Sequence, residues 1–298
     1  MAQIGFIGLG RMGAGMVERM VKAKHSVVVF NRSQDKVRLA VRRGAVGAAS
    51  VDELVAKLKG SRRIIWVMLP AGKITEQYLQ QLIPRLRKGD IVIDGANDFY
   101  GNAQRHAPWF KKKGIHFFDV GVSGGVHGLK NGYTLMIGGP KAQFKNIEPF
   151  CKALAPKGGY ALFGEVGAGH FVKSVHNIVE YVYLQGLAEG MELLRRFSQP
   201  IDLARATAVW EPASVVRSWL LELTTTALSR PDFKNISSKI DSVTIDELRQ
   251  TVSGVKGYAP AFEVATKIRR QQIPKFNFGK QVIAAVRREF GGHSVKKK

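Results

Sequence analysis

The sequence predicts a doubly wound α/β sheet in the N-terminal part of the chain, followed by an all-α C-terminal part. Short apolar runs alternate with helical patterns as far as residue 164, which is typical of a parallel sheet covered by helices on both faces. A glycine-rich turn directly follows the first apolar run, and only helical patterns follow residue 166. We therefore expect two domains, residues 1–166 and residues 167–298.

The elements of the first domain are expected in a regular order. The first strand covers residues 3–8, and a helical stretch then extends to about residue 24. Further apolar runs that we interpret as strands cover residues 25–30, 64–69, 91–95, 116–120, 134–138 and 161–164. Helical patterns at residues 51–58 and 75–87 separate some of these strands.

The composition is that of an ordinary globular protein. The chain has 298 residues, of which 45% are hydrophobic and 23% charged, enough for one large or two medium domains with a real core. The single cysteine, Cys151, excludes an internal disulfide and a cysteine-based zinc cluster, and it fits a reducing compartment such as the cytoplasm. We expect no metal site, no signal peptide and, without an apolar run near 18 residues, no membrane span.

The charge is unusual, because 46 lysines and arginines face 23 acidic residues and leave a net charge of +23. Nucleic-acid binding, attraction of small polyanions and a general compositional bias would each fit this excess. The basic residues are spread along the chain and are not interleaved with aromatic residues as in RNA-recognition motifs. We therefore expect only weak, salt-sensitive association with nucleic acid and no specific binding.

Three glycines lie between the first strand and the helix after it, as the fingerprint of Rossmann-type dinucleotide sites requires. The first allows a tight turn, the second lets a pyrophosphate approach the backbone, and the third lets helix and strand pack closely. The helix start adds unpaired N–H groups and a favourable dipole. The motif therefore predicts a dinucleotide site formed by Gly8, Leu9, Gly10, Arg11, Met12 and Gly13.

The end of the second strand predicts which nicotinamide cofactor binds. An acidic residue there would bind the ribose 2′-hydroxyl and repel a 2′-phosphate, but this chain has Asn31, Arg32 and Ser33. Arg32 can offer a planar charged fork to the phosphate, and its two neighbours can donate hydrogen bonds. We therefore predict NADP over NAD. A solvated Arg32 is the alternative, and nearby Asp35 keeps NAD open.

The third apolar run ends in Met68 and Leu69 and is followed by Pro70, and we expect these three residues to line the nicotinamide side of the cofactor. Lys73 follows three residues later and has two interpretations. It can reach an anion in the site, or it can be an exposed lysine at the start of a helix.

A stripe of polar residues lies in the segment after residue 167. If this segment is helical, Lys173, Asn177 and Glu180 stand at positions i, i+4 and i+7 and share one side. Directing an amine, an amide and a carboxylate the same way costs desolvation without a packing benefit, which indicates a site. A solvated polar face is the alternative, but apolar neighbours such as Val175 and Val179 indicate a largely buried helix.

These motifs, with others of the same kind, span almost the whole chain. They lie at residues 8–13, 67–72, 93–97, 121–125, 132–139, 167–170, 173–181, 217–221 and 290–293. On them the chain resembles the 6-phosphogluconate dehydrogenases (decarboxylating), in their shorter form, within the β-hydroxyacid dehydrogenase group. The segments 173–181 and 217–221 are the most particular to members that act on sugar acids.

The resemblance implies an oxidative decarboxylation that turns 6-phosphogluconate into ribulose 5-phosphate. NADP takes a hydride from C3 of the aldonate, while the free amine of Lys173 takes the hydroxyl proton. The 3-keto acid then loses carbon dioxide, and Glu180 protonates the enediol at C1. Such a division of labour requires an amine that is neutral and a carboxyl that is protonated when each acts.

The resemblance also implies how the substrate is held. The carboxylate and hydroxyls match Asn97, Ser123, Gly124, Gly125, His176 and Asn177. Asn97 is expected to contact the cofactor as well. The phosphate end matches Tyr181 and Arg269, together with Arg287 and His293 of a neighbouring subunit. This implies a homodimer or homotetramer whose C-terminal tail reaches a neighbouring active site.

Several positions depart from the family pattern. Ala96 replaces a glycine, Asp98 a small hydroxyl residue, and His127 an aromatic or small residue. The usual phosphate-side motif is missing from residues 243–249, where Arg249, or Lys256 beyond it, is a candidate substitute. Another sugar acid or a short hydroxy acid therefore stays open as the substrate. A cofactor-binding protein without activity is a third reading, which the intact stripe disfavours.

Overall fold

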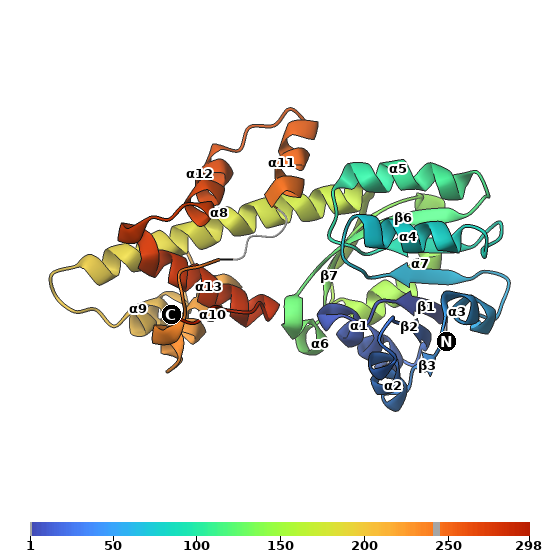
Figure 1. The fold of residues 1–298 in the computed structure, drawn as a ribbon, viewed down its shortest axis with the longest axis horizontal. Coiled ribbons are helices and arrows are strands. Elements are labelled where there is room, and N and C mark those ends of the chain that lie inside the picture. The colour runs from blue at the N-terminus through green and yellow to red at the C-terminus, as the bar shows by residue number, and fades with distance from the viewer. Residues whose placement is uncertain (1, 241–244) are drawn as a thin grey trace. The chain divides into compact units, whose positions relative to one another are not determined.

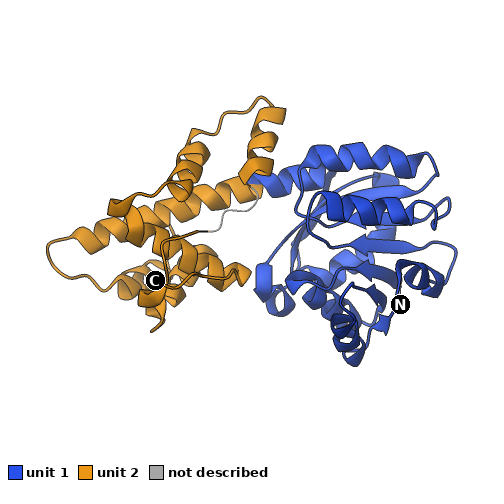
Figure 2. Cartoon of the chain, in the orientation of Figure 1, with its two compact units in different colours: residues 1–175 blue, residues 176–298 orange. Residues whose placement is uncertain are grey.

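The computed structural model describes residues 2–240 and 245–298, and the predictions for residues 243 and 244 lie outside the described residues. The chain divides into two compact units, residues 1–175 and residues 176–298, called here the sheet unit and the helical unit (Figure 2). The division falls inside helix α8 (Ala168–Arg196), because the first turns of this helix belong to the sheet unit. The boundary predicted at residues 166 and 167 lies just before the helix begins.

Within the described residues the sheet unit holds an eight-stranded sheet in the order β3-β2-β1-β4-β5-β6-β7-β8 (Figure 1). This arrangement confirms the predicted doubly wound sheet. Strand β3 was not predicted, because two residues carry no recognisable pattern. The strands are β1 (Gln3–Ile7), β2 (Ser26–Phe30), β3 (Val46–Gly47), β4 (Ile64–Val67), β5 (Ile91–Asp94), β6 (His116–Ser123), β7 (Thr134–Gly138) and β8 (Tyr160–Gly164).

One pair of strands differs from the prediction of a parallel sheet. Strands β6 and β7 are antiparallel, whereas the other paired strands are parallel. The reason is the short connection between them, residues 124–133, which holds only a 3-10 turn (Gly125–His127) and α6 (Gly128–Asn131). A parallel crossover needs about a dozen residues or more, usually with a full helix.

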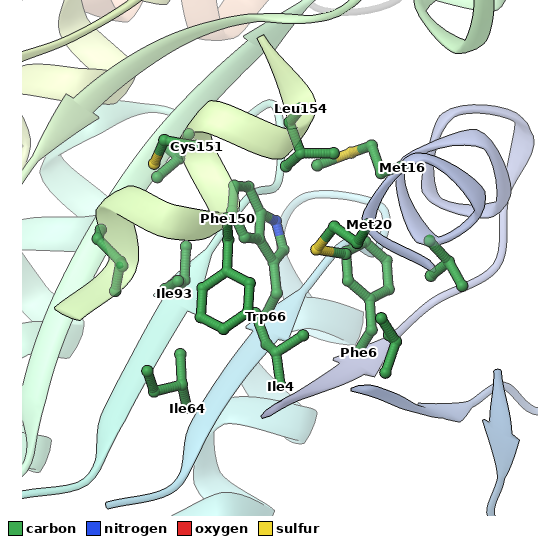
Figure 3. Packing of buried hydrophobic residues seen from close by; sticks show 14 of the residues in the cluster. Ile4, Phe6, Met16, Met20, Ile64, Trp66, Ile93, Phe150, Cys151 and Leu154 are labelled. Atoms are coloured by element: carbon green, nitrogen blue, oxygen red, sulfur yellow. The ribbon is translucent and has the colours of Figure 1, made fainter. Parts of the chain in front are cut away.

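Helices cover both faces of the sheet. Apolar residues of α1 and α7 pack on one face, where Phe6 and Trp66 of the strands meet Met16, Met20 and Phe150 (Figure 3). Residues of α3, α4 and α5 pack on the other face. Strands buried on both faces explain the continuous apolar runs of the sequence. The helices are α1 (Arg11–Lys22), α2 (Gln34–Arg42), α3 (Val51–Lys57), α4 (Lys73–Leu82), α5 (Tyr100–Lys111) and α7 (Lys141–Leu154).

The described part of the helical unit consists of helices joined by turns, which confirms the all-α prediction. Its core joins α8, α10 and α13 through residues such as Leu184, Met191, Ala227 and Val282. No helix among the described residues is long and apolar enough to cross a membrane. After the end of α8, the helices are α9 (Leu203–Trp210), α10 (Trp219–Ser229), α11 (Ile245–Gly254), α12 (Pro260–Arg270) and α13 (Asn277–Gly291).

Candidate active site

The glycine-rich turn has the geometry that a dinucleotide site needs. Gly8 has φ +107, and a Cβ there would overlap the carbonyl oxygen of Met68. A Cβ at Gly13 would overlap the carbonyl oxygen of Gly8, so the first and third glycines allow close packing. Around Gly10 there is nothing within 4 Å of such a Cβ, which leaves room at the start of α1. A pyrophosphate at this helix start would face free N–H groups.

The end of β2 is tied to this turn by one side chain. The Oδ1 atom of Asn31 accepts a hydrogen bond from Leu9 N at 3.0 Å, and its Nδ2 donates to the carbonyl oxygen of Ser33 at 3.3 Å. Asn31 therefore positions the loop and leaves little of its side chain for a phosphate. Arg32 is exposed and forms no hydrogen bond or ion pair within the described residues. The carboxylate of Asp35 pairs with Arg38.

The loop between β4 and α4 lies against the residues that follow β5. Asp98, at 3.5 Å, accepts a hydrogen bond from Gly72 N, and its other oxygen accepts one from Asn102 Nδ2 at 2.9 Å. Met68, Leu69 and Pro70 precede this contact. Lys73 is the exposed first residue of α4, which is the simpler of its two interpretations.

The start of α8 is fixed to the sheet by a buried acid. Both carboxylate oxygens of Asp119 in β6 accept backbone hydrogen bonds, from Gly167 N and from His170 N, at 2.7 Å each. A carboxylate at a helix start satisfies N–H groups that the helix leaves unpaired and interacts well with its dipole. The first turn of α8 is therefore held in one place.

Three glycines, Gly121, Gly138 and Gly169, let α8 pack closely against β6 and β7. A Cβ at Gly121 would overlap the Cβ of Lys173, and a Cβ at Gly169 would overlap the carbonyl oxygen of Asp119. The same added atom at Gly138 would come within 2.7 Å of Gly169 N. Lys173 is consequently buried beside the sheet.

Lys173 therefore lies near other predicted site residues of the sheet unit. Ser123 ends β6, and Gly124 and Gly125 follow with φ +121 and +53. Asn97 follows the neighbouring strand β5. Because β5 and β6 are parallel and paired, their carboxyl ends meet at one edge of the sheet.

The polar stripe lies on one continuous helix, as predicted. Asn177 and Glu180 are half-buried on α8, and the ring Nδ1 of His176 lies 3.1 Å from Asn177 Oδ1. The prediction of a largely buried helix is wrong for the side of α8 that carries Val175 and Val179. Val175 and Val179 are exposed, Val179 to 61%, because they stand at i and i+4 away from the stripe.

The helical unit contains two buried arginines. Arg269 of α12 is 2% exposed and Arg287 of α13 is 8% exposed. The guanidinium of Arg269 lies 3.7 Å from the ring centre of Tyr181, and its Nη2 donates to the carbonyl oxygen of Tyr181 at 3.2 Å. Its Nε is buried without a partner among the described residues.

Opposing charges surround Arg269. Burial is the main reason that the pKa of Arg269 is lowered to about 10. The charge of Arg287 acts in the same direction, while Tyr181 and Glu180 act in the opposite direction. Arg287 is buried in the single chain, and its contribution to a neighbouring subunit stays a prediction. His293 follows α13 and its ring stacks edge-on against Phe290.

Arg249 does not replace the missing phosphate-side motif. Its guanidinium binds the carboxylate of Glu263, with the closest pair at 2.7 Å, and donates to Thr266 Oγ1 at 3.1 Å. Lys256 is exposed in a turn after α11, with φ +51. Within the described residues, neither side chain forms a hydrogen bond or an ion pair with Arg269 or Tyr181.

Comparison with known proteins identifies the family. Residues 3–164 match the NAD binding domain of 6-phosphogluconate dehydrogenase, and residues 169–270 match the C-terminal domain of the same enzyme. The chain belongs to the 6-phosphogluconate dehydrogenase family. It is therefore an NAD(P)-binding oxidoreductase, as the glycine turn predicted.

Relatives differ in length and in cofactor. A Bacillus subtilis protein, YqeC, whose assignment as a 6-phosphogluconate dehydrogenase is provisional, is 33% identical over 99% of this chain and all of its own length. An NAD(+)-dependent 6-phosphogluconate dehydrogenase of Haloferax volcanii is 40% identical over 74% of this chain and 73% of its own. An NADP(+)-dependent Bacillus subtilis enzyme is 34% identical over 85% of this chain and 55% of its own.

Solved structures show the same fold. The 6-phosphogluconate dehydrogenase of Plasmodium falciparum has a TM-score of 0.81 and 25% identity, and it covers 90% of this chain and 61% of its own. The 3-hydroxyisobutyrate dehydrogenase of Mycobacterium tuberculosis has a TM-score of 0.77 at 23% identity, over 95% of this chain and 98% of its own. The second likeness concerns the fold alone.

Sequence reasoning missed the buried acids that hold the site. Asp94 and Asp119 lie inside strands where every neighbour is apolar, and His170 begins α8. A single acidic residue in a strand buried on both faces was the available signal, because such a charge needs a local partner.

Proposed function

We propose that this protein catalyses the oxidative decarboxylation of 6-phosphogluconate to ribulose 5-phosphate, with reduction of NADP. The observation that carries the proposal is the pair of buried arginines, Arg269 and Arg287, with an unpaired Nε on Arg269. Arg269 forms no ion pair within the described residues, and a buried guanidinium is costly without an anion. A phosphate supplies that anion with oxygens that suit the planar fork.

The reaction assigns a proton step to each end of the polar stripe. Burial of Lys173 favours its neutral amine, which can accept the proton of the C3 hydroxyl. NADP, which the turn at Gly8, Gly10 and Gly13 would hold, would supply the hydride acceptor for the same carbon. After carbon dioxide leaves, Glu180 donates a proton to C1. Asn97, Ser123, Gly124, Gly125, His176 and Asn177 orient the carboxylate and hydroxyls in this proposal.

The test of the proposal is direct. Purified protein is mixed with NADP and, separately, with 6-phosphogluconate, gluconate and a short 3-hydroxy acid, while the absorbance of reduced cofactor and the release of carbon dioxide are followed. We expect the fastest reduction with 6-phosphogluconate, accompanied by carbon dioxide. Reduction with another acid, or without carbon dioxide, would favour a different β-hydroxyacid dehydrogenase activity. That alternative is supported by Arg249, which is committed to Glu263.

Replacing Arg32 with alanine is expected to lower kcat/KM with NADP about 10- to 100-fold, because one charge-assisted contact to the 2′-phosphate is lost. The value with NAD should change little. Arg42→Ala is the matched control, since it removes the same charge from the exposed far end of α2. Equal effects of the two substitutions, or faster turnover of the wild type with NAD, would contradict NADP preference.

Replacing Arg269 with lysine is expected to raise KM for 6-phosphogluconate about tenfold or more, because lysine keeps the charge but not the planar fork. Any turnover of unphosphorylated gluconate should be nearly unchanged. Arg270→Lys, on an exposed neighbour paired with Asp246, is the control. A melting temperature close to that of the wild type shows that the fold survived. An unchanged KM would place the phosphate elsewhere.

We also propose a homodimer or homotetramer in the cytoplasm, in which the C-terminal tail with His293 reaches a neighbouring active site. Exposed apolar side chains on the helical unit, such as Leu193, Phe197 and Val209, support association. In the single chain the tail pairs with its own residues, since Ser237 N donates to the carbonyl oxygen of Lys296 at 2.7 Å. Light scattering of the purified protein measures the oligomer size, and a monomer would contradict this proposal.

A further inference from the structure

Two buried aspartates stand side by side at the edge of the sheet where the predicted site residues gather. Asp94 is the last residue of β5, and Asp119 lies in β6 directly opposite it in the parallel register. Register partners point to the same face of a sheet. Both side chains therefore face the same side, beneath the start of α8.

Each aspartate holds a backbone segment that leads to a proposed site residue. The Oδ1 atom of Asp94 accepts a hydrogen bond from Ala96 N at 3.0 Å, and the next residue is Asn97. Asp119 accepts from His170 N, which stands one helical turn before Lys173. The segment that carries Asn97 is thus held by β5, and the helical turn that carries Lys173 is held by the neighbouring strand β6.

Asp94 and His170 hold further buried polar atoms that have no partner among the described residues. Asp94 is 1% exposed and its Oδ2 has no hydrogen-bond partner among the described residues. His170 is also 1% exposed, and neither of its ring nitrogens has such a partner. Leaving three buried polar atoms unpaired would be costly, so a hydrogen bond between the side chains of Asp94 and His170 is favoured.

We propose that Asp94 and His170 act as a positioning pair that shares one proton and keeps Asn97 and Lys173 in a fixed relation. An imidazole and a carboxyl can each donate or accept, so one shared proton pairs Asp94 Oδ2 with one of the two ring nitrogens of His170 without burying a net charge. A small rotation of either side chain, or one bridging water, closes the contact. The pair joins the end of β5 to the start of α8, and it touches no reacting atom.

The charges around Asp94 fit this assignment. Burial is the main reason that the pKa of the Asp94 carboxyl is raised to about 6. Asp98 and Asp119 act in the same direction, and the charge of His170 opposes them together with the Ala96 N–H. The folded protein therefore keeps a proton that the unfolded chain releases near pH 4. Stability contributed by this proton is present at low pH and is lost as the pH rises toward about 6.

The first experiment is a double-mutant cycle that measures turnover in the proposed reaction, and it therefore rests on the proposed function. Asp94→Asn keeps an oxygen for Ala96 N but cannot titrate, and His170→Gln removes the imidazole. We expect each to lower kcat about tenfold or more, with KM for NADP within about twofold, because misplacement affects the reacting geometry first. The double variant should lose no more than the worse single variant, since either change breaks the pair.

Asp90→Asn is the matched control for this cycle. Asp90 is a buried acid just before β5, at the other end of the strand, where Arg63 pairs with it at 2.7 Å. Its substitution should lower the melting temperature and leave kcat near that of the wild type. Losses that multiply in the double variant, or single variants with unchanged kcat, would overturn the proposal.

The second arm does not depend on the substrate. The melting temperature is measured between about pH 4 and pH 8 for the wild type and both single variants. Asp94→Asn should lack the fall in stability that the wild type shows as the pH rises toward 6. In His170→Gln that fall should extend to higher pH, because the opposing charge is gone. If the pH range of the fall in melting temperature is the same in His170→Gln as in the wild type, the proposed pair is wrong. If none of the tested acids is turned over, only the proposed function is wrong.

Discussion

Replacing Lys173 with methionine is expected to abolish turnover while NADP binding persists. Methionine keeps the length and apolar stem that pack against Gly121 but has no group that can accept a proton. Loss of a positioned general base typically lowers kcat by about 10²- to 10⁴-fold. Reduced-cofactor absorbance measures the first effect, and titration with NADPH measures the second.

Two further variants test whether Lys173 acts as a general base or only supplies a buried positive charge. Lys173→Arg keeps a positive charge that cannot be given up, so it should be as inactive as the methionine variant. Lys280→Met removes another buried lysine, whose Nζ donates to the carbonyl oxygen of Gln271 at 2.8 Å, and should leave kcat nearly unchanged. Activity that survives in Lys173→Met would show that the base is a different residue.

The fold was predictable where local patterns decide the structure. Runs such as residues 64–69 and 91–93 are apolar throughout because strands β4 and β5 are buried on both faces. Strand β3 has two residues and pairs only with β2, so no local pattern could predict it. The direction of β7 depends on the length of the connection between β6 and β7, and the periodicity of apolar residues does not record that length.

The site was predictable only in part, because its supports are tertiary. Helical spacing placed Lys173, Asn177 and Glu180 on one stripe, and α8 has that geometry. Nothing in the spacing shows that Asp119 holds the start of this helix from a strand about 50 residues earlier. The burial of Arg269 and Arg287 depends likewise on how α12 and α13 pack.

Exposure was the least predictable property of the stripe. Apolar neighbours were taken to indicate a buried helix, yet Val179 is 61% exposed in the single chain. A sequence records that a position is apolar, but not whether its cover comes from the same chain or from another molecule. The exposed valines are therefore compatible with the homo-oligomer that we propose.

Adding one methyl group at Gly121 is expected to reduce activity far more than the added volume alone suggests. In Gly121→Ala the new Cβ would overlap the Cβ of Lys173 and lie 3.0 Å from the carbonyl oxygen of Gly169. Neither neighbour is the far end of a flexible side chain, so the first turns of α8 must move away from β6. Overpacking of this kind costs about 1–3 kcal/mol of stability.

The displacement also carries Lys173 away from the end of β6, and a shift of about 1 Å can lower kcat about 100-fold. We therefore expect kcat of Gly121→Ala to fall by roughly this factor even in protein that remains folded, as judged by its melting temperature. Gly186→Ala is the control, because nothing lies within 4 Å of a Cβ at that position of the same helix. It should stabilise α8 by up to about 1 kcal/mol and leave kcat unchanged. Wild-type kcat in Gly121→Ala would mean that the close approach of α8 to β6 does not position the base, and Lys173 would then need another support.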